Sequence, residues 1–290
     1  AGEGSYDYHV QMALSSDAGA TWTEARRLHE DDGPGEHGFA SLCALDGSRF
    51  LALWLDGRHT GARAEDGRGA MAVYSRTVGA DGEMGDEFMV DDRACDCCPT
   101  ALAVGPTGPV AAWRDRSSGE VRDTATAVLR KGSWAKGRAE FGGGWETYQC
   151  PVNGPTLAVK DKRTALAWFT DAGGDPRVEM VESKDGGAHW GRSAMRIDEG
   201  SPVGRVQVAY TRDGGLAALW LERAGDGGGA AWRVRLMEGP RSQPAFTLAE
   251  VPGSRASGHA RLAPIRDGLV FAWNGTRGRV ETATVRLRSD

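Results

Sequence analysis

The sequence contains no apolar run that approaches the roughly 20 residues a transmembrane helix needs, so it predicts no membrane span. It also has no excess of positive charge. The formal net charge is −5, which argues against nucleic acid or an anionic membrane surface as a partner. No signal peptide is recognisable at Ala1, so the sequence is either cytoplasmic or already processed. There is no convincing amphipathic helix.

Glycine, in contrast, is abundant. The 42 glycines indicate many tight turns and therefore many short strands. Apolar residues make up 40% of the 290 residues, enough for a globular chain with a sizeable core. The composition therefore predicts an all-β protein, and no linker divides the chain into domains.

A short apolar strand with a tryptophan near its end recurs five times. The strands are Phe50–Asp56, Val110–Asp115, Ala165–Asp171, Ala217–Glu222 and Val270–Asn274. Their tryptophans are spaced by 59, 55, 52 and 53 residues. A near-constant period of this length, filled by four strands, is typical of the blades of a β-propeller. Alanine and valine fill the first two strands of each repeat, which predicts that both are buried on both faces.

The two ends of the sequence predict incomplete blades in one domain, 1–290. Residues 1–35 contain only segments like third and fourth strands, blades 2–5 occupy about 36–255, and residues 256–290 contain three strands. We therefore expect a six-bladed propeller of four-stranded antiparallel blades with an incomplete first and last blade. Either the termini share a closing blade, or an upstream segment or separate chain supplies the inner strands of blade 1; we favour the second arrangement.

Two stretches match the Asp-box pattern S-x-D-x-G-x-x-W. They consist of Ser15, Asp17, Gly19 and Trp22, and of Ser183, Asp185, Gly187 and Trp190. In such a hairpin the aspartate caps backbone N–H groups, the glycine takes a positive φ and the tryptophan packs the turn against the blade. The boxes are 168 residues apart, three repeats of about 56. This pattern resembles the bacterial-neuraminidase-repeat, or sialidase-like, six-bladed propellers, in which the Asp-box lies on the face opposite the active site.

The resemblance implies a fold more strongly than an activity. Sialidases carry an arginine triad for the substrate carboxylate, a Tyr–Glu nucleophilic pair and an aspartic acid. This sequence has no Arg-Ile-Pro motif, and none of its five tyrosines matches the family pattern for the nucleophile. We therefore carry over the fold and not the catalytic residues, and a glycoside hydrolase of sialidase type remains one hypothesis.

Cysteines gather around Asp96. Cys95, Cys97 and Cys98 lie within four residues, and Cys150 precedes a proline as Cys98 does. On a propeller, residues about 55 apart become neighbours, so we expect these four cysteines and His37 to converge. A soft-metal site is one interpretation, with copper(I) favoured over zinc in an oxidising compartment. Structural disulfides are the second, and several disulfides with redox exchange are the third. His9 and His29 are interpreted as surface or turn residues.

In sialidase-like propellers, the loops that lead into each first strand and those that leave each second strand open on one face. This frame brings Asp56, Arg58, Arg114, Asp115 and His259 to the central funnel. They could bind an acidic sugar and support glycoside chemistry. Alternatively, the Trp-x-Asp-x-Arg segments form salt bridges and turn caps at the blade edges.

Three functions follow from these features. The leading hypothesis is a protein that binds copper through the cysteine cluster; the second is a glycoside hydrolase acting on an acidic sugar; the third is a non-catalytic interaction scaffold with structural disulfides. A metal ion or a small carbohydrate is thus the expected ligand. The Asp-Cys-Cys-Pro element resembles that of exported sialidase-like proteins, which implies a periplasmic or secreted location.

Overall fold

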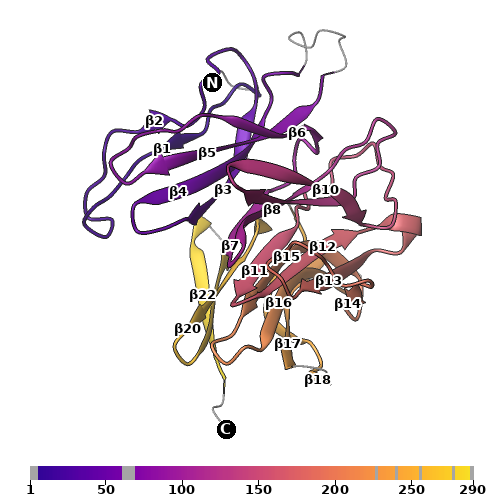
Figure 1. The fold of residues 1–290 in the computed structure, drawn as a ribbon. Coiled ribbons are helices and arrows are strands. Elements are labelled where there is room, and N and C mark those ends of the chain that lie inside the picture. The colour runs from indigo at the N-terminus through magenta and orange to yellow at the C-terminus, as the bar shows by residue number, and fades with distance from the viewer. Residues whose placement is uncertain are drawn as a thin grey trace.

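The computed structural model describes residues 6–60, 69–225, 228–238, 241–254, 257–275 and 278–287, and in these ranges it is an all-β protein (Figure 1). The described residues contain no α-helix, and a 3-10 turn lies at Ala172–Gly174. In the same ranges, no helix has the length and apolarity needed to cross a membrane. The predicted fold class, all-β with several four-stranded antiparallel sheets, is confirmed.

Within the described residues, the strands form six sheets in which neighbours in sequence are paired, except that β19 pairs with β17. The first two sheets contain β1 (Gln11–Met12) and β2 (Arg26–Arg27), then β3 (His37–Ala44), β4 (Arg49–Asp56), β5 (Met71–Gly79) and β6 (Phe88–Ala94). The next two contain β7 (Ala101–Gly105), β8 (Gly108–Arg114), β9 (Thr124–Arg130) and β10 (Ser133–Phe141), then β11 (Thr156–Lys160), β12 (Arg163–Thr170), β13 (Arg177–Ser183) and β14 (Met195–Arg196). The last two contain β15 (Pro202–Tyr210), β16 (Leu216–Ala224), β17 (Gly229–Glu238), β18 (Arg241–Ser242) and β19 (Phe246–Pro252), then β20 (Arg261–Ile265), β21 (Gly268–Asn274) and β22 (Val280–Arg286).

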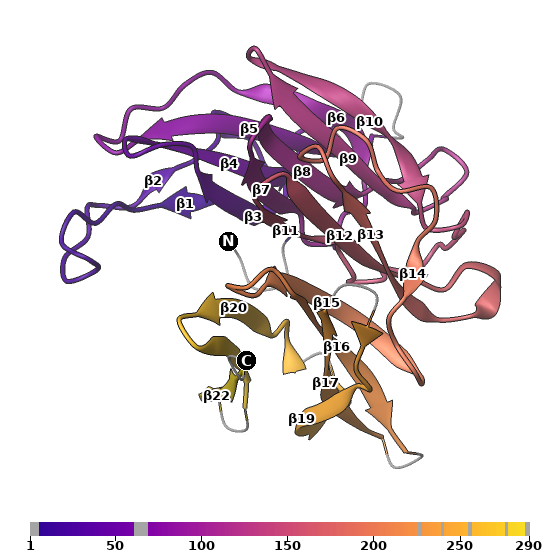
Figure 2. The ribbon, with the colours of Figure 1, turned by 60° about the horizontal axis from the view of Figure 1, so that its bottom comes forward.

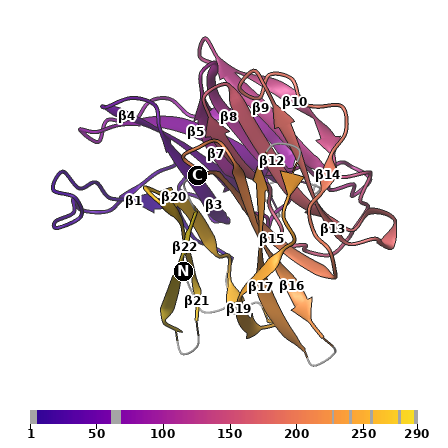
Figure 3. The same ribbon diagram turned by 90° about the horizontal axis from the view of Figure 1, so that it is seen from below.

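The first strands of the five larger sheets lie next to one another. The contacts run from β3 to β7, β11, β15 and β20 in that order. The sheets follow one another around this inner region, from the indigo β3–β6 sheet to the yellow β20–β22 sheet (Figures 2 and 3). All five inner strands, or the loops just before them, line a cavity of about 480 Å³. This radial arrangement is the one that a β-propeller requires.

The second strands carry the core. β4, β8, β12 and β16 are buried over six or more consecutive residues, which agrees with the expectation from their alanines and valines. Three of the first strands differ from that expectation, because β3, β7 and β11 consist largely of half-buried or exposed residues. The physical reason is the cavity: one face of each inner strand borders open space instead of another sheet.

Polar contacts join each inner strand to the next. At one junction no side chain fits, because a Cβ on Gly154 would overlap the carbonyl of Pro99. Such a close backbone approach requires glycine. Elsewhere the junctions are hydrogen bonds: Ser41 Oγ to the Thr100 carbonyl at 2.7 Å, Asn153 Nδ2 to the Val203 carbonyl at 3.0 Å, and Arg205 Nη1 to the Gly258 carbonyl at 2.8 Å.

The two Asp-box turns have the same local structure. In each, the serine hydroxyl donates to the aspartate and accepts from the glycine N–H, at 2.8 and 2.8 Å in the first turn and 2.7 and 2.9 Å in the second. Gly19 and Gly187 have φ values of 90° and 88°, as expected. The tryptophans differ. Trp190 donates to Thr126 Oγ1 on the neighbouring sheet, whereas Trp22 is 64% exposed and does not pack its turn against a blade.

The described residues contain two short strands before β3 and three strands after β19. The N-terminal segment attaches to the β3–β6 sheet through a parallel bridge between Tyr8 and Glu36 and through Leu28, which packs on Ala52 and Trp54. One sheet exceeds the predicted four strands, because β18 and β19 both pair with β17. Six blades, the domain limits and the sialidase-like type stay predictions.

Candidate functional site

The strand directions bring the predicted site residues to one end of the sheets, which we call the proximal end: the end at which β3, β7, β11, β15 and β20 begin. His37 begins β3, and Cys95–Cys98 precede β7. Asp56 and Arg114 end β4 and β8, respectively, at the same end because β3–β4 and β7–β8 are antiparallel. Cys150 and His259 stand in the loops before β11 and β20.

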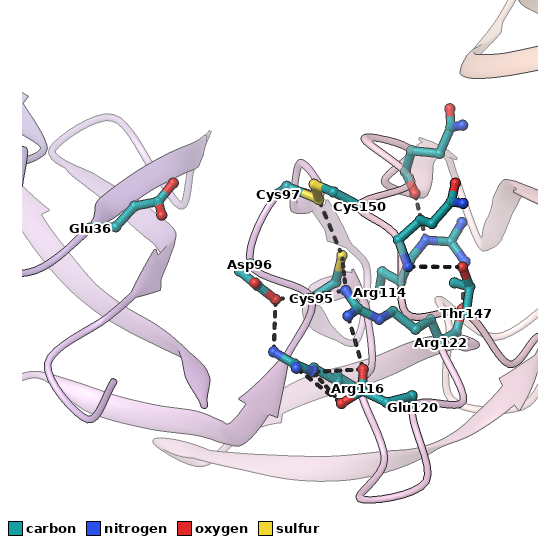
Figure 4. The surroundings of a disulfide bond; sticks show 12 residues. Glu36, Cys95, Asp96, Cys97, Arg114, Arg116, Glu120, Arg122, Thr147 and Cys150 are labelled. Carbon is teal, nitrogen blue, oxygen red and sulfur yellow. Dashed lines mark hydrogen bonds and ion pairs between the residues drawn. A yellow bond between two sulfur atoms is a disulfide. The ribbon is translucent and has the colours of Figure 1, made fainter. Parts of the chain in front are cut away.

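The cysteines converge, but not as four free thiols. Cys97 and Cys150 form a disulfide, whereas Cys95 and Cys98 are free and buried (Figure 4). Cys95 Sγ lies 3.8 Å from Cys97 Sγ. In this state a site with all four thiolates is not formed, because a bonded sulfur pair offers no thiolate ligand. The bond is instead the structural disulfide that the sequence left open as the second interpretation.

Cys95 has an electrostatic environment that favours its thiolate. Its pKa is lowered to about 6 by a hydrogen bond from Cys98, which outweighs the opposing effect of burial, and by the charges of Arg114 and Arg122. Arg122 Nη1 lies 3.3 Å from the sulfur. Burial raises the pKa of Cys98 well above its usual value. The pair therefore favours the thiolate at Cys95 and the protonated thiol at Cys98.

Charged side chains surround this cluster and pair with one another. Arg116 binds Asp96 at 3.1 Å and Glu120 at 2.9 Å, and Arg122 binds Glu120 at 2.9 Å (Figure 4). Arg114 is different, because it is only 1% exposed and its guanidinium donates to three backbone carbonyls. A guanidinium used in this way cannot contact a ligand in the cavity, so the predicted substrate role of Arg114 has no support here.

Asp56 and Arg58 form a salt bridge and turn cap at a strand end, which was the alternative interpretation of these residues from the sequence. Asp56 is fully buried, accepts from Trp54 Nε1 at 2.8 Å and is held by both Nε and Nη2 of Arg58. Burial alone would raise the pKa of Asp56, but hydrogen bonds from Arg58, His37 and Trp54 outweigh it and hold the pKa well below its usual range. Asp56 is therefore a buried carboxylate.

Two other predicted residues, Asp115 and His259, have side chains suited to a chemical role. Burial and the neighbouring charge of Asp91 raise the pKa of Asp115 to about 6. A carboxylic acid with such a pKa can act as a general acid near neutral pH. His259 and Arg261 line the cavity, and burial lowers the pKa of His259 to about 4, so its imidazole is neutral.

The structure also reveals a Tyr–Glu pair that the sequence analysis did not find. The Tyr8 hydroxyl donates to Glu36 Oε1. Burial raises the pKa of Glu36; the hydrogen bond from Tyr8 opposes this effect, and the charge of Asp96 adds to it. Gly38 makes room for the phenol ring, since a Cβ there would lie 2.9 Å from Tyr8 Cε2. Glu36 directly precedes β3, and Figure 4 shows it across from the loop that carries Asp96 and Cys97.

His37 lies apart from its predicted cysteine partners. Within the described residues it groups with His9 and His29, and the cysteines form a separate group. The rings of His29 and His37 are stacked, with centroids 3.8 Å apart, and His9 lies 5.0 Å from His29. His29 was interpreted as a surface or turn residue; it lies in the bend after β2, but it is 3% exposed and so is not on the surface. The sequence offered only one signal for these site residues: Glu36 and His37 stand between Gly35 and Gly38 at the start of a strand.

No protein-family model matches the chain, and no curated protein matches it in sequence. Among solved structures, the GH93 α-L-arabinofuranosidase of Fusarium graminearum in complex with arabinobiose superposes with a TM-score of 0.52 at 11% identity, over 84% of this chain and 76% of that one. The α-L-arabinanase of Penicillium chrysogenum has a TM-score of 0.46 at 12% identity, over 86% and 80%. The fucose-specific lectin of Aleuria aurantia has a TM-score of 0.44 at 10% identity, over 84% and 90%. The first of these similarities supports the β-propeller class of this fold.

The thiol states can be counted directly. We expect the protein denatured without reductant to expose three thiols, those of Cys43, Cys95 and Cys98, and five after reduction. Peptide mapping of the alkylated, unreduced protein should yield one linked pair that joins Cys97 to Cys150. Linkage of Cys150 to a different cysteine, or five thiols before reduction, would contradict this arrangement.

Proposed function

We propose that the protein is a β-propeller glycoside hydrolase whose reactive pair is Tyr8 and Glu36 at the proximal end. The hydrogen bond from the Tyr8 hydroxyl to the Glu36 carboxylate carries this proposal. A Tyr–Glu pair is the nucleophilic unit of the sialidases that the sequence resembles, and a tyrosine nucleophile is an accepted variant of retaining glycoside hydrolysis. The similarity in fold to a solved arabinofuranosidase supports the coarser statement that this architecture accommodates such enzymes.

The chemistry assigned to the pair is proton transfer coupled to attack. Tyr8 is a neutral phenol, because burial and the bond to Glu36 raise its pKa, so its oxygen must lose a proton as it attacks the anomeric carbon. Glu36 is placed to accept that proton, and its raised pKa makes it a stronger base than an exposed glutamate. We assign the acid that protonates the leaving group to Asp115, whose pKa of about 6 suits that role.

The inner-strand cavity is large enough for a sugar-sized ligand, and Tyr8, Glu36 and Asp115 lie outside its wall. Its volume of about 480 Å³ is within the usual range of small-molecule sites. Phe39, one residue beyond the Gly38 that contacts Tyr8, belongs to its wall. Gln207, His259 and Arg261 add polar groups to the wall, and the charge of Arg261 favours an acidic sugar. An open cavity also disfavours the interaction scaffold, which would need a funnel filled by side chains.

Replacing one phenol tests the pair. With the best substrate from a panel of neutral and acidic aryl glycosides, we expect Tyr8→Phe to lower kcat/KM by roughly 10²–10⁴-fold, because the nucleophile is removed. For the wild type, the acid limb of kcat/KM should lie above the usual glutamate pKa, because Glu36 must be ionised to act as the base and its pKa is raised.

Tyr210→Phe is the matched control. Tyr210 donates to Glu182 at 2.6 Å, and it ends β15 at the opposite end of the sheets. This variant should retain wild-type kcat/KM. Equal activity of the Tyr8→Phe variant and the wild type, or no turnover of any glycoside by the wild type, would exclude the proposed mechanism.

Copper binding is the second candidate, and one observation favours it. The sulfur atoms of Cys95, Cys97 and Cys98 all lie within 4.8 Å of one another. Reduction of the Cys97–Cys150 bond would free two more thiols beside Cys95 and Cys98, and clustered thiolates are preferred ligands of copper(I).

Competition with a chromophoric chelator tests this candidate. The reduced protein should withdraw one equivalent of copper(I) from the chelator, and the Cys97→Ser, Cys98→Ser double variant should not. Cys43→Ser is the control and should behave as the wild type does. Failure of the reduced wild type to compete with the chelator would exclude copper(I) binding by the cysteine cluster.

A further inference from the structure

Three histidines meet where the N-terminal segment docks on the β3–β6 sheet. His9 precedes β1, His29 follows β2 and His37 begins β3. One ring nitrogen from each lies within 4.8 Å of those of the other two. His29 and His37 are 3% and 1% exposed, and His9 is half-buried. Three imidazoles from separate segments are thus packed together, two of them buried and one half-buried.

Several of their ring nitrogens are left without a hydrogen bond of ordinary geometry within the described residues. These nitrogens are His29 Nδ1 and Nε2 and His9 Nδ1, and all three are buried. Buried polar atoms are nearly always satisfied in native proteins, so each exception needs a physical explanation. Three exceptions in one cluster point to a shared ligand that accepts nitrogen lone pairs.

The environment of His37 shows what charge that ligand carries. His37 Nδ1 lies 3.3 Å from the Gly35 carbonyl, which places a proton on this nitrogen. Nε2 faces carboxylate oxygens of Asp31 at 3.2 Å and Asp56 at 3.4 Å, so this position favours a cation, either a proton on Nε2 or a metal ion. A proton on Nε2 accounts for His37 and its hydrogen bond to Asp56, but it supplies no ligand to the nitrogens of His29.

We propose that His9, His29 and His37 form a binding site for a divalent transition-metal ion of the zinc class, and that the ion fastens the N-terminal segment to β3. Imidazole nitrogens suit zinc, nickel and copper(II), whereas calcium and magnesium take oxygen ligands. Asp31 and Asp56 supply the negative charge that offsets a dication and act as outer partners of the histidines.

Binding one ion requires the rings to rotate. Two ligand nitrogens at about 2.0–2.1 Å from one tetrahedral zinc ion lie roughly 3.3–3.4 Å apart, whereas the nitrogens of this cluster lie up to 4.8 Å apart. The stacked rings of His29 and His37 are parallel, so their in-plane lone pairs run side by side, and a shared ion requires this stack to open by side-chain rotation.

The histidine site differs from the predicted cysteine site in its ligands and in the chain segments that the bound ion would hold together. His9 follows Tyr8 and His37 follows Glu36, so the ion would hold the two chain segments that carry the Tyr–Glu pair. The metal site does not depend on the proposed hydrolase activity, because binding can be measured without a substrate.

Metal analysis of untagged protein, purified without chelator or metal-affinity resin, tests the proposal. We expect about one equivalent of zinc after dialysis against zinc, and loss of that equivalent in His29→Phe, which keeps an aromatic ring in the stack. His189→Phe is the matched control, because His189 is an exposed histidine on the second Asp-box turn and should not affect binding. Cys95→Ser, Cys98→Ser should also retain the ion, which separates this site from the thiols.

Cobalt(II) gives a second readout that needs no variant. The wild-type protein loaded with cobalt should show the visible bands of a tetrahedral or five-coordinate nitrogen and oxygen site without a thiolate charge-transfer band. Zinc should also slow proteolysis within residues 8–29. Absence of zinc and cobalt binding, retention of zinc by a folded His29→Phe variant, or a thiolate charge-transfer band would each overturn the proposal.

Discussion

The structure of the proximal end depends on the interactions of the buried Asp56 carboxylate. It binds the Trp54 indole and the Arg58 guanidinium, and it faces His37. Arg58 in turn binds Glu87 at 2.8 Å, and Glu87 lies 3.7 Å from Arg76. Removing one partner of a buried ion pair typically costs about 3–5 kcal/mol, because the other charge is left unpaired.

This network connects the first full sheet to the segment before it. Arg76 Nη1 donates to the Leu28 carbonyl at 2.8 Å, next to His29 in sequence. The N-terminal segment is therefore held by an apolar contact at Leu28, by the Tyr8–Glu36 bridge and by the Arg76 hydrogen bond. The same docking brings Tyr8 to Glu36 and His9 to His37, so the candidate reactive pair and the histidine cluster share one structural cause.

The repeats made the architecture predictable, whereas the contacts within the site could not be predicted from the sequence. The tryptophan period located β4, β8, β12, β16 and β21, because each strand repeats one packing environment. The fully buried state of Arg114 was hidden, since carbonyls from three separate segments satisfy it.

The pairing of Tyr8 with Glu36 spans 28 residues and crosses two short strands that have no periodic pattern. His9 and His29 stand in the same irregular segment, so their spacing in sequence carries no ligand signature. The disulfide could be predicted only in part. The repeat predicts that Cys150 lies near the cysteine cluster, but three neighbouring cysteines leave its partner, Cys97, undetermined.

Covalent trapping tests the central claim most directly, namely that the docked N-terminal segment delivers a nucleophile to the proximal end. The protein would be incubated with activated fluorinated glycosides, which slow the breakdown of a glycosyl–enzyme intermediate, and then digested and mapped by mass spectrometry. The account predicts a single glycosyl adduct on Tyr8. An adduct on another residue, or glycoside turnover without any adduct at Tyr8, would contradict it.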